Sequence, residues 1–132
     1  MRSSALFSTL IALISLSGLA QSAQAQDAAS KAMTGRWARG DGIAQVQISP
    51  CGSQICAVNT AIKGGDGSEK VGDRLVMNVK PTAANMLSGT AYDPQRKMSY
   101  NIDITVADNR LSTRGCILGR LLCKAVSWSR IR

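Results

Sequence analysis

Short runs in which apolar and polar residues alternate recur along this chain, and this pattern restricts the fold more than any other feature of the sequence. The clearest run extends from Lys97 to Val106. The residues on its apolar face are Met98, Tyr100, Ile102, Ile104 and Val106. A period of two residues is typical of a β-strand with one buried face, and no stretch after residue 25 repeats at the helical period of about 3.6 residues. The sequence therefore predicts an all-β domain.

Turn signals divide the chain into about eight strands. They are expected at residues 35–39, 43–49, 57–62, 74–80, 86–92, 97–106, 110–116 and 122–130. Asp41-Gly42 and Asp93-Pro94 are typical of tight turns, and the glycine-rich, charged segment Lys63–Asp73 predicts a long mobile loop. Pro81 is expected to end its strand or to lie just beyond it. A small antiparallel up-and-down barrel is predicted because closure leaves no exposed strand edge, and a two-sheet sandwich is the alternative.

The first 25 residues have the features of a secretory signal. A basic start at Arg2 precedes an apolar run from Leu6 to Leu19, and Ala23-Gln24-Ala25 supplies the small residues of a cleavage site. The run is shorter than the roughly 20 residues that a membrane-spanning helix needs. We expect cleavage after Ala25, export to a bacterial periplasm, and no integral membrane segment in the mature chain. The expected organisation is a signal peptide at 1–25, a lead-in at 26–34 that is flexible or forms one helical turn, and a single domain at 35–132.

Composition argues against several classes of function. The whole chain has a net charge of +8, but its basic residues are scattered and only five residues are aromatic, whereas nucleic-acid-binding proteins usually show a basic cluster with interleaved aromatic residues. The chain contains no histidine, which removes the commonest general base and the usual nucleophile–histidine couples. We therefore expect no nucleic acid partner, no cofactor and no enzymatic activity.

Four cysteines in an exported chain favour two disulfides. Their spacing predicts the local pairs Cys51–Cys56 and Cys116–Cys123, with long-range pairing between the two hairpins as the alternative. A zinc site and a redox site are both disfavoured, because the chain has neither histidine nor paired CxxC spacing. No metal ligand is assigned.

Alternation also predicts the direction of each cysteine side chain. Cys116 and Cys123 both face outward if the apolar residues of their strands face inward, as a cross-strand disulfide requires. The first pair is less regular, because inward-facing Val58 and Ile62 would turn Cys56 inward while Cys51 faces outward. We expect a bulge or an irregular turn near this pair.

The two ends of the domain carry a further pattern. Gly35-Arg36-Trp37 resembles the Gly-x-Trp opening of lipocalin-like (calycin) barrels, in which an arginine of the last strand packs on the tryptophan, and Trp128-Ser129-Arg130 supplies such an arginine. A larger ordered set of motifs resembles the exported bacterial family called domain of unknown function 2147. The set comprises Gly35-x-Trp37, Ile48-x-x-Cys51-Gly52-x-x-Ile55-Cys56, Tyr92-Asp93-Pro94, Arg114-Gly115-Cys116, Cys123 and Trp128-x-Arg130. The resemblance implies a small lipocalin-like barrel in the cell envelope with no agreed activity, and structural roles for Trp37, Trp128 and Arg130.

Two functions remain open at this point. The first is a carrier or sensor that holds a small apolar or amphipathic ligand inside the barrel. Its expected wall residues are Val46, Ile48, Leu75, Met77, Met98, Tyr100, Ile102 and Ile104. The second is an envelope interaction protein with a filled barrel, whose basic surface or Lys63–Asp73 loop contacts a protein or an anionic polymer. A cavity would favour the first function, and a filled core would favour the second.

Overall fold

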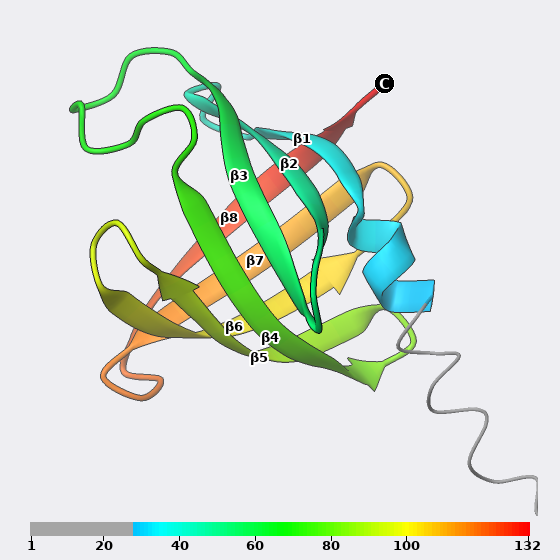
Figure 1. Ribbon diagram of the computed structural model, residues 1–132. Helices are drawn as coiled ribbons and strands as arrows, with labels where there is room; N and C mark the ends of the chain where they lie inside the picture. The colour runs from blue at the N-terminus through cyan, green and yellow to red at the C-terminus, as the bar shows by residue number, and fades with distance from the viewer. Residues whose placement is uncertain (1–27) are drawn as a thin grey trace, which may run out of the picture.

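Eight antiparallel strands close into one barrel, in which each strand pairs with its neighbours in sequence and β1 pairs with β8 (Figure 1). The strands are β1 (Gly35–Arg39), β2 (Ala44–Cys51), β3 (Gln54–Ile62), β4 (Arg74–Ala83), β5 (Met86–Asp93), β6 (Met98–Val106), β7 (Arg110–Ile117) and β8 (Leu122–Ile131). The computed structural model describes residues 28–132, so the predicted signal peptide lies outside the described residues. This order confirms the up-and-down barrel, is compatible with a lipocalin-like form, and excludes the sandwich.

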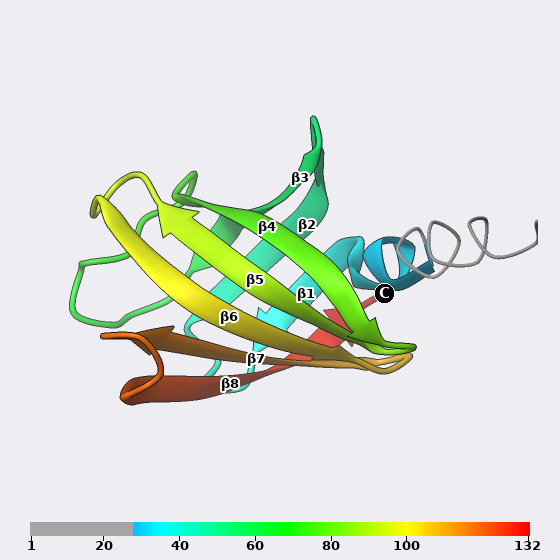
Figure 2. The same cartoon turned by 90° about the horizontal axis from the view of Figure 1, so that it is seen from below.

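The up-and-down order places alternate turns at opposite ends of the barrel. The β1–β2, β3–β4, β5–β6 and β7–β8 turns form one end, called the mouth below. A short helix over residues 28–33 and the remaining three turns belong to the other end, called the base (Figure 2). No helix within residues 28–132 is long and apolar enough to cross a bilayer.

The helix at the base matches one of the two expectations for the lead-in, the single helical turn. A flexible lead-in was one expectation for residues 26–34, but Ala29 and Met33 are buried in the core of the barrel. The indole Nε1–H of Trp37 donates a hydrogen bond of 2.8 Å to the Met33 carbonyl oxygen. Residues 28–33 are held as a helix at the base because Ala29 and Met33 lie about one helical turn apart and both pack into the core.

The first and last strands meet as the Gly-x-Trp motif predicts. Trp37 is fully buried and pairs directly with Arg130 in the β1–β8 register. Gly35 has a φ of +136°, and a Cβ at this position would lie 2.8 Å from Nη1 of Arg130. Glycine is thus required by its backbone conformation and by the arginine that lies against it.

Both predicted disulfides, Cys51–Cys56 and Cys116–Cys123, are present. A β-bulge in β3 resolves the irregular first pair, since Gln45 pairs with Ala61 while Val46 pairs with Asn59. The extra residue, Thr60, reverses the alternation of β3.

The bulge also sets the side-chain directions on its two sides. On the hairpin side of the bulge, Ala57 and Asn59 face the interior, and Val58 does not. Ile62 lies beyond the bulge and pairs with buried Ala44, so it keeps the inward direction. The expected bulge is therefore confirmed, and Val58 is turned away from the interior because strict alternation does not continue across an inserted residue.

Two strand boundaries also differ from the prediction. The connection expected at residues 50–56 is shorter, because β2 reaches Cys51 and β3 begins at Gln54. β4 continues through Pro81 to Ala83, although Pro81 was expected to end the strand. Within the described residues, β3 pairs with β4 only as far as Met77. Pro81 therefore lies beyond the β3–β4 ladder, where its missing N–H interrupts no hydrogen bond to β3.

A candidate ligand cavity with a polar collar

A cavity of about 330 Å³ occupies the barrel interior between the base and the mouth. Its apolar wall consists of Met33, Val46, Ile48, Ala57, Leu75, Met77, Ala91, Tyr100, Ile102, Leu111, Gly115, Val126 and Trp128. The wall carries small residues at Ala57, Ala91 and Gly115, and a Cβ at Gly115 would meet no atom within 4 Å. The interior is therefore not filled, because several inward positions carry side chains too small to reach the centre.

Six of the eight predicted wall residues line this cavity. They are Val46, Ile48, Leu75, Met77, Tyr100 and Ile102. Ile104 does not line it and is fully buried in the packed core. Met98 is 39% exposed at the mouth end of β6, so it lies outside the cavity. All four β6 residues share one face, but the strand runs from the mouth to the base, so each lies at a different depth.

The polar residues that surround the cavity near the mouth were not predicted from the sequence pattern. This polar collar consists of Arg39, Asn59, Glu69, Asp73, Asp93, Gln95, Arg96 and Lys124. Most of these residues lie in turns or at strand ends, where polar residues have local reasons to occur. The feature they share is a position in or near the turns at one end of the barrel. This feature predicts that they lie together only after the strand order is known.

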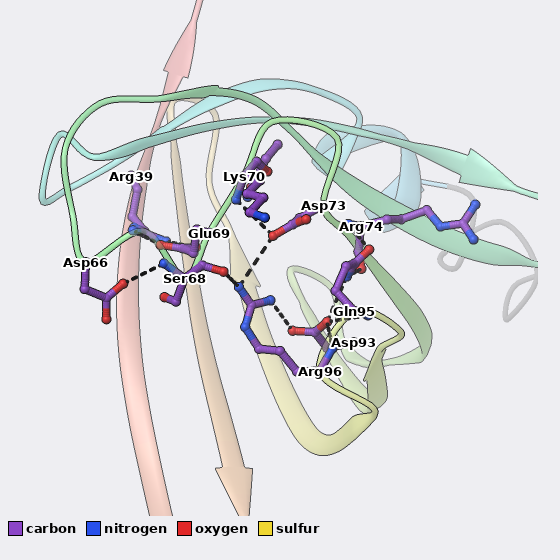
Figure 3. A network of polar contacts seen from close by, with 11 residues as sticks. Arg39, Asp66, Ser68, Glu69, Lys70, Asp73, Arg74, Asp93, Gln95 and Arg96 are labelled. Atoms are coloured by element: carbon purple, nitrogen blue, oxygen red, sulfur yellow. Dashed lines mark hydrogen bonds and ion pairs between the residues drawn. The ribbon is translucent and has the colours of Figure 1, made fainter.

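Asp93 is the best-connected acid of the collar. Its Oδ1 accepts hydrogen bonds from the backbone N–H groups of Gln95 and Arg96 and from the Gln95 amide, and its Oδ2 accepts one of 2.7 Å from Nη1 of Arg96 (Figure 3). Burial raises the pKa of Asp93, but these hydrogen bonds lower it more, and the net shift is downward. Asp93 is therefore held as a carboxylate at the mouth.

A second arginine fixes the β3–β4 loop over the mouth. Nη1 and Nη2 of Arg39 donate to the two carboxylate oxygens of Glu69 at 2.8 and 2.7 Å (Figure 3). This bidentate pair lowers the pKa of Glu69, mainly through the hydrogen bonds from Arg39. Nε of Arg39 also donates to Asp41 at 2.9 Å.

The Lys63–Asp73 loop is more constrained than the sequence predicted. Arg96 donates to the backbone carbonyl of Ser68 and contacts Asp73 at 3.4 Å. The backbone N–H of Asn59 donates to the Asp73 carbonyl, and that of Gly72 donates to the Asn59 carbonyl. Together with the Arg39–Glu69 pair, these contacts hold a loop that glycine and charge content alone suggested to be mobile.

Lys124 differs from the two collar arginines in its charge environment. It follows the inward alternation of Val126 and Trp128 on β8 and pairs in register with Gly115. Within residues 28–132, no carboxylate forms a salt bridge with its ammonium group.

Trp128 lies deeper in the wall, and its Nε1–H donates a hydrogen bond of 3.1 Å to the Thr113 hydroxyl. Because its one polar group is satisfied by the protein, the indole contributes an apolar surface to the cavity.

The cavity could bind an amphipathic molecule, because an apolar chamber lies below a polar collar. Within the collar, Lys124 forms no salt bridge with a carboxylate among the described residues. Within the described part of the chain, no three histidine, cysteine or acidic residues gather in a way that could hold a metal ion.

Comparison with solved structures shows similarity to a redesigned β-barrel, with a TM-score of 0.51 and 13% identity over 80% of this chain and 96% of that chain. This likeness concerns the fold alone. No match was found among the curated proteins. A family described as an uncharacterized protein conserved in bacteria (DUF2147) matches residues 35–130, which is the whole barrel apart from Ile131 at the end of β8. The chain therefore belongs to the bacterial family called domain of unknown function 2147.

Proposed function

We propose that this protein is an exported, non-enzymatic binder of a small amphipathic ligand. The observation that carries the proposal is the cavity of about 330 Å³, with apolar walls and a polar collar at its mouth. Ligand pockets usually have volumes of about 300–1,000 Å³, so this cavity suits a small molecule or a single alkyl chain. The apolar part of the ligand would contact the wall, and its polar group would lie in the collar.

The position of Lys124 favours a ligand with an anionic group. The collar arginines contribute less, because Arg39 and Arg96 are already engaged by carboxylates. The Arg74 side chain points away from the network in Figure 3, although its backbone N–H donates a hydrogen bond of 2.8 Å to the Gln95 side-chain oxygen. A carboxylate or phosphate group at the collar would therefore meet Lys124 first.

A cavity-filling variant tests the proposal. Gly115 faces the cavity and has open space beyond its backbone, so Gly115→Leu should fold and should occupy part of the chamber. Titration with a fluorescent fatty acid should show binding to the wild type and at least about tenfold weaker binding to this variant, because the probe loses apolar contact area.

Ser112→Leu is the matched control. Ser112 lies on the same strand, is exposed, and faces outward, so its replacement adds the same side chain without touching the chamber. Absence of probe binding by the wild type would reject the proposal. Equal binding by the wild type and by a folded Gly115→Leu variant would show that any bound probe lies elsewhere.

Export is the second part of the proposal, and it is supported by the signal-like segment and by two disulfides that together include all four cysteines of the chain. Intact mass spectrometry of periplasmic extracts should show a chain that begins at Gln26 and binds no alkylating reagent before reduction. A cytoplasmic chain that retains Met1 would contradict export.

A further inference from the structure

Large exposed apolar side chains gather at the mouth of the barrel. Of the seven such residues in the described chain, six belong to turns or strand ends at the mouth, and only Met86 lies at the base. The six are Val71, Tyr92, Met98, Leu118, Leu121 and Leu122. Exposed surfaces that concentrate large apolar residues usually bind another protein or a membrane, so the mouth is a candidate interaction surface.

Three of these residues form the tip of the β7–β8 hairpin, called the leucine tip below. Leu118, Leu121 and Leu122 are 69%, 82% and 57% exposed, which makes them a protruding apolar cluster. Figure 2 shows this hairpin at the same end as the β3–β4 loop and far from the helix at the base. The apolar cluster is therefore the part of the mouth that the β7–β8 turn contributes.

The backbone of the leucine tip is unusual for exposed leucine. Leu118 has a φ of 51° and precedes Gly119 at 68°, so two successive residues adopt the left-handed conformation. Asparagine or glycine is the common choice there, because a larger side chain crowds the backbone. Leucine at position 118 costs free energy twice, through the strained left-handed backbone and through the exposure of its apolar side chain to water. This cost indicates that Leu118 is present for an interaction and not for the stability of the isolated domain.

Several contacts make the leucine tip rigid. The Cys116–Cys123 disulfide joins β7 to β8 immediately below it. Arg120 within the tip donates to Asp103 at 2.6 Å, and the Asn101 amide donates to the Gly119 carbonyl at 3.0 Å. The leucines are thus presented by a preformed turn, and little conformational freedom is lost when they meet a partner.

Basic residues accompany the tip. Lys97 adjoins exposed Met98 in the neighbouring β5–β6 turn, and no carboxylate among residues 28–132 forms a salt bridge with it. Arg120 lies between the leucines, where it also contacts Asp103, and Lys124 of the collar follows two positions after Leu122. Lipid bilayers that carry anionic phospholipid attract such residues, whose long side chains can reach phosphate groups while apolar neighbours enter the boundary with the acyl chains.

We propose that the leucine tip inserts into the interface of a bilayer that contains anionic phospholipid and thereby places the mouth of the barrel against the membrane surface. A convex turn of leucines fits a lipid surface better than a protein surface, because central positions of protein interfaces are enriched in tryptophan, tyrosine and arginine, and leucine is under-represented. The chain from Gln26 onward has 15 lysine and arginine residues and 8 acidic residues, and this net charge of +7 adds attraction to the same surface.

Vesicle flotation tests this proposal with the full mature protein. Vesicles of phosphatidylglycerol and phosphatidylethanolamine should carry the wild type, whereas vesicles of phosphatidylcholine alone should carry much less of it. The double variant Leu118→Asn, Leu121→Ser should partition at least about tenfold more weakly into the anionic vesicles, because two apolar side chains no longer enter the interface. Asparagine accepts the left-handed conformation, so this variant should fold.

Two controls separate the leucine tip from other parts of the molecule. Met86→Ser removes an exposed apolar side chain at the base and should float like the wild type. Gly115→Leu alters the chamber and should also float like the wild type, so failure of membrane binding and failure of ligand binding can be told apart. A tryptophan introduced as Leu121→Trp should be quenched by brominated phospholipid in the vesicles.

Three results would overturn the proposal. The first is a wild type that stays with the unbound fraction on anionic vesicles. The second is a double variant that floats as well as the wild type, which would mean that surface charge alone drives binding. The third is self-association that sedimentation detects in the wild type and not in the double variant, together with no flotation, which would assign the tip to contact between copies of the chain.

Discussion

The guanidinium of Arg130 lies over the ring of Trp37, with its Cζ atom 4.2 Å from the ring centroid. The same guanidinium donates hydrogen bonds to the carbonyl oxygens of Ala32 at 2.7 Å, Thr34 at 3.1 Å and Asp108 at 2.9 Å. One side chain thus joins the last strand to the first strand, to the end of the helix at the base and to the β6–β7 turn. These contacts use the planar, five-donor shape of arginine as well as its charge.

Replacement of Arg130 should therefore destabilise the protein even when the charge is kept. Arg130→Ala should lower the free energy of unfolding by about 1–3 kcal/mol, since it removes the cation–π contact and the donors for three carbonyl groups. Arg130→Lys should cost nearly as much, because an ammonium group cannot stack on the indole and reach all three acceptors. Denaturant unfolding checks both values.

Arg36→Ala provides the control, since Arg36 is an exposed arginine on β1 beside the same strand pair. It should change stability by no more than about 0.5 kcal/mol. If Arg130→Lys were as stable as the wild type, charge alone would account for the contact, and barrel closure would not require a planar guanidinium.

Asp93 should make the stability of the barrel depend on acid pH. Its pKa is lowered in the folded state, so the unfolded chain binds more protons between the unfolded pKa of about 3.9 and the lower folded pKa. The stabilisation by Asp93 is therefore complete above the unfolded pKa and is lost as pH falls through the folded pKa. Asp93→Asn should be less stable at neutral pH and should lose less stability on acidification.

Urea unfolding at several pH values between about 2 and 7 measures this effect, since that interval brackets the unfolded pKa and extends well below it. Some acid dependence should remain in Asp93→Asn, because Glu69 and Asp103 also have lowered pKa values through Arg39 and Arg120. Arg96→Gln removes the strongest donor to Asp93 and should reduce the acid dependence in the same direction. Parallel profiles for the wild type and Asp93→Asn would contradict the assignment.

Gly89 should tolerate no side chain at all. A Cβ on this β5 residue would lie 2.0 Å from the carbonyl oxygen of Asn78 and 2.9 Å from the Cα of Val79, both backbone atoms of β4. Gly89→Ala should therefore force the two paired strands apart and cost about 1–3 kcal/mol or more. Gly115→Ala adds the same methyl group where no atom lies within 4 Å and should stay within about 0.5 kcal/mol of the wild type. Calorimetric or denaturant unfolding of the two variants compares them directly, and equal stabilities would refute the crowding at Gly89.

Local periodicity was sufficient to predict the strands. Side chains on a strand alternate between its two faces, so the run from Met98 to Val106 reveals a half-buried strand wherever it folds. Closure of the barrel was predicted because a closed meander leaves no exposed strand edge, and the resemblance of the two ends to lipocalin-like barrels supported it. The local disulfides were favoured by cysteine spacing across tight turns. Strict alternation failed where one residue broke the local rule, as Thr60 does in β3 by forming a bulge.

The sequence by itself predicted the strands and favoured the up-and-down order and the local disulfides over their alternatives, because these depend on short-range periodicity and spacing. The meeting of Trp37 with Arg130 was implied by the resemblance of the two chain ends to lipocalin-like barrels. Only the tertiary structure decided that the barrel keeps a chamber. The volume of the chamber is the volume enclosed by the eight strands minus the summed volume of the inward side chains. Ala57, Ala91 and Gly115 leave space only because they line the same interior, and this is known only once the strands are placed around the barrel. The collar has the same origin, since Arg39 and Glu69 are 30 residues apart and meet only because β1 and the β3–β4 loop reach the same end of the closed sheet.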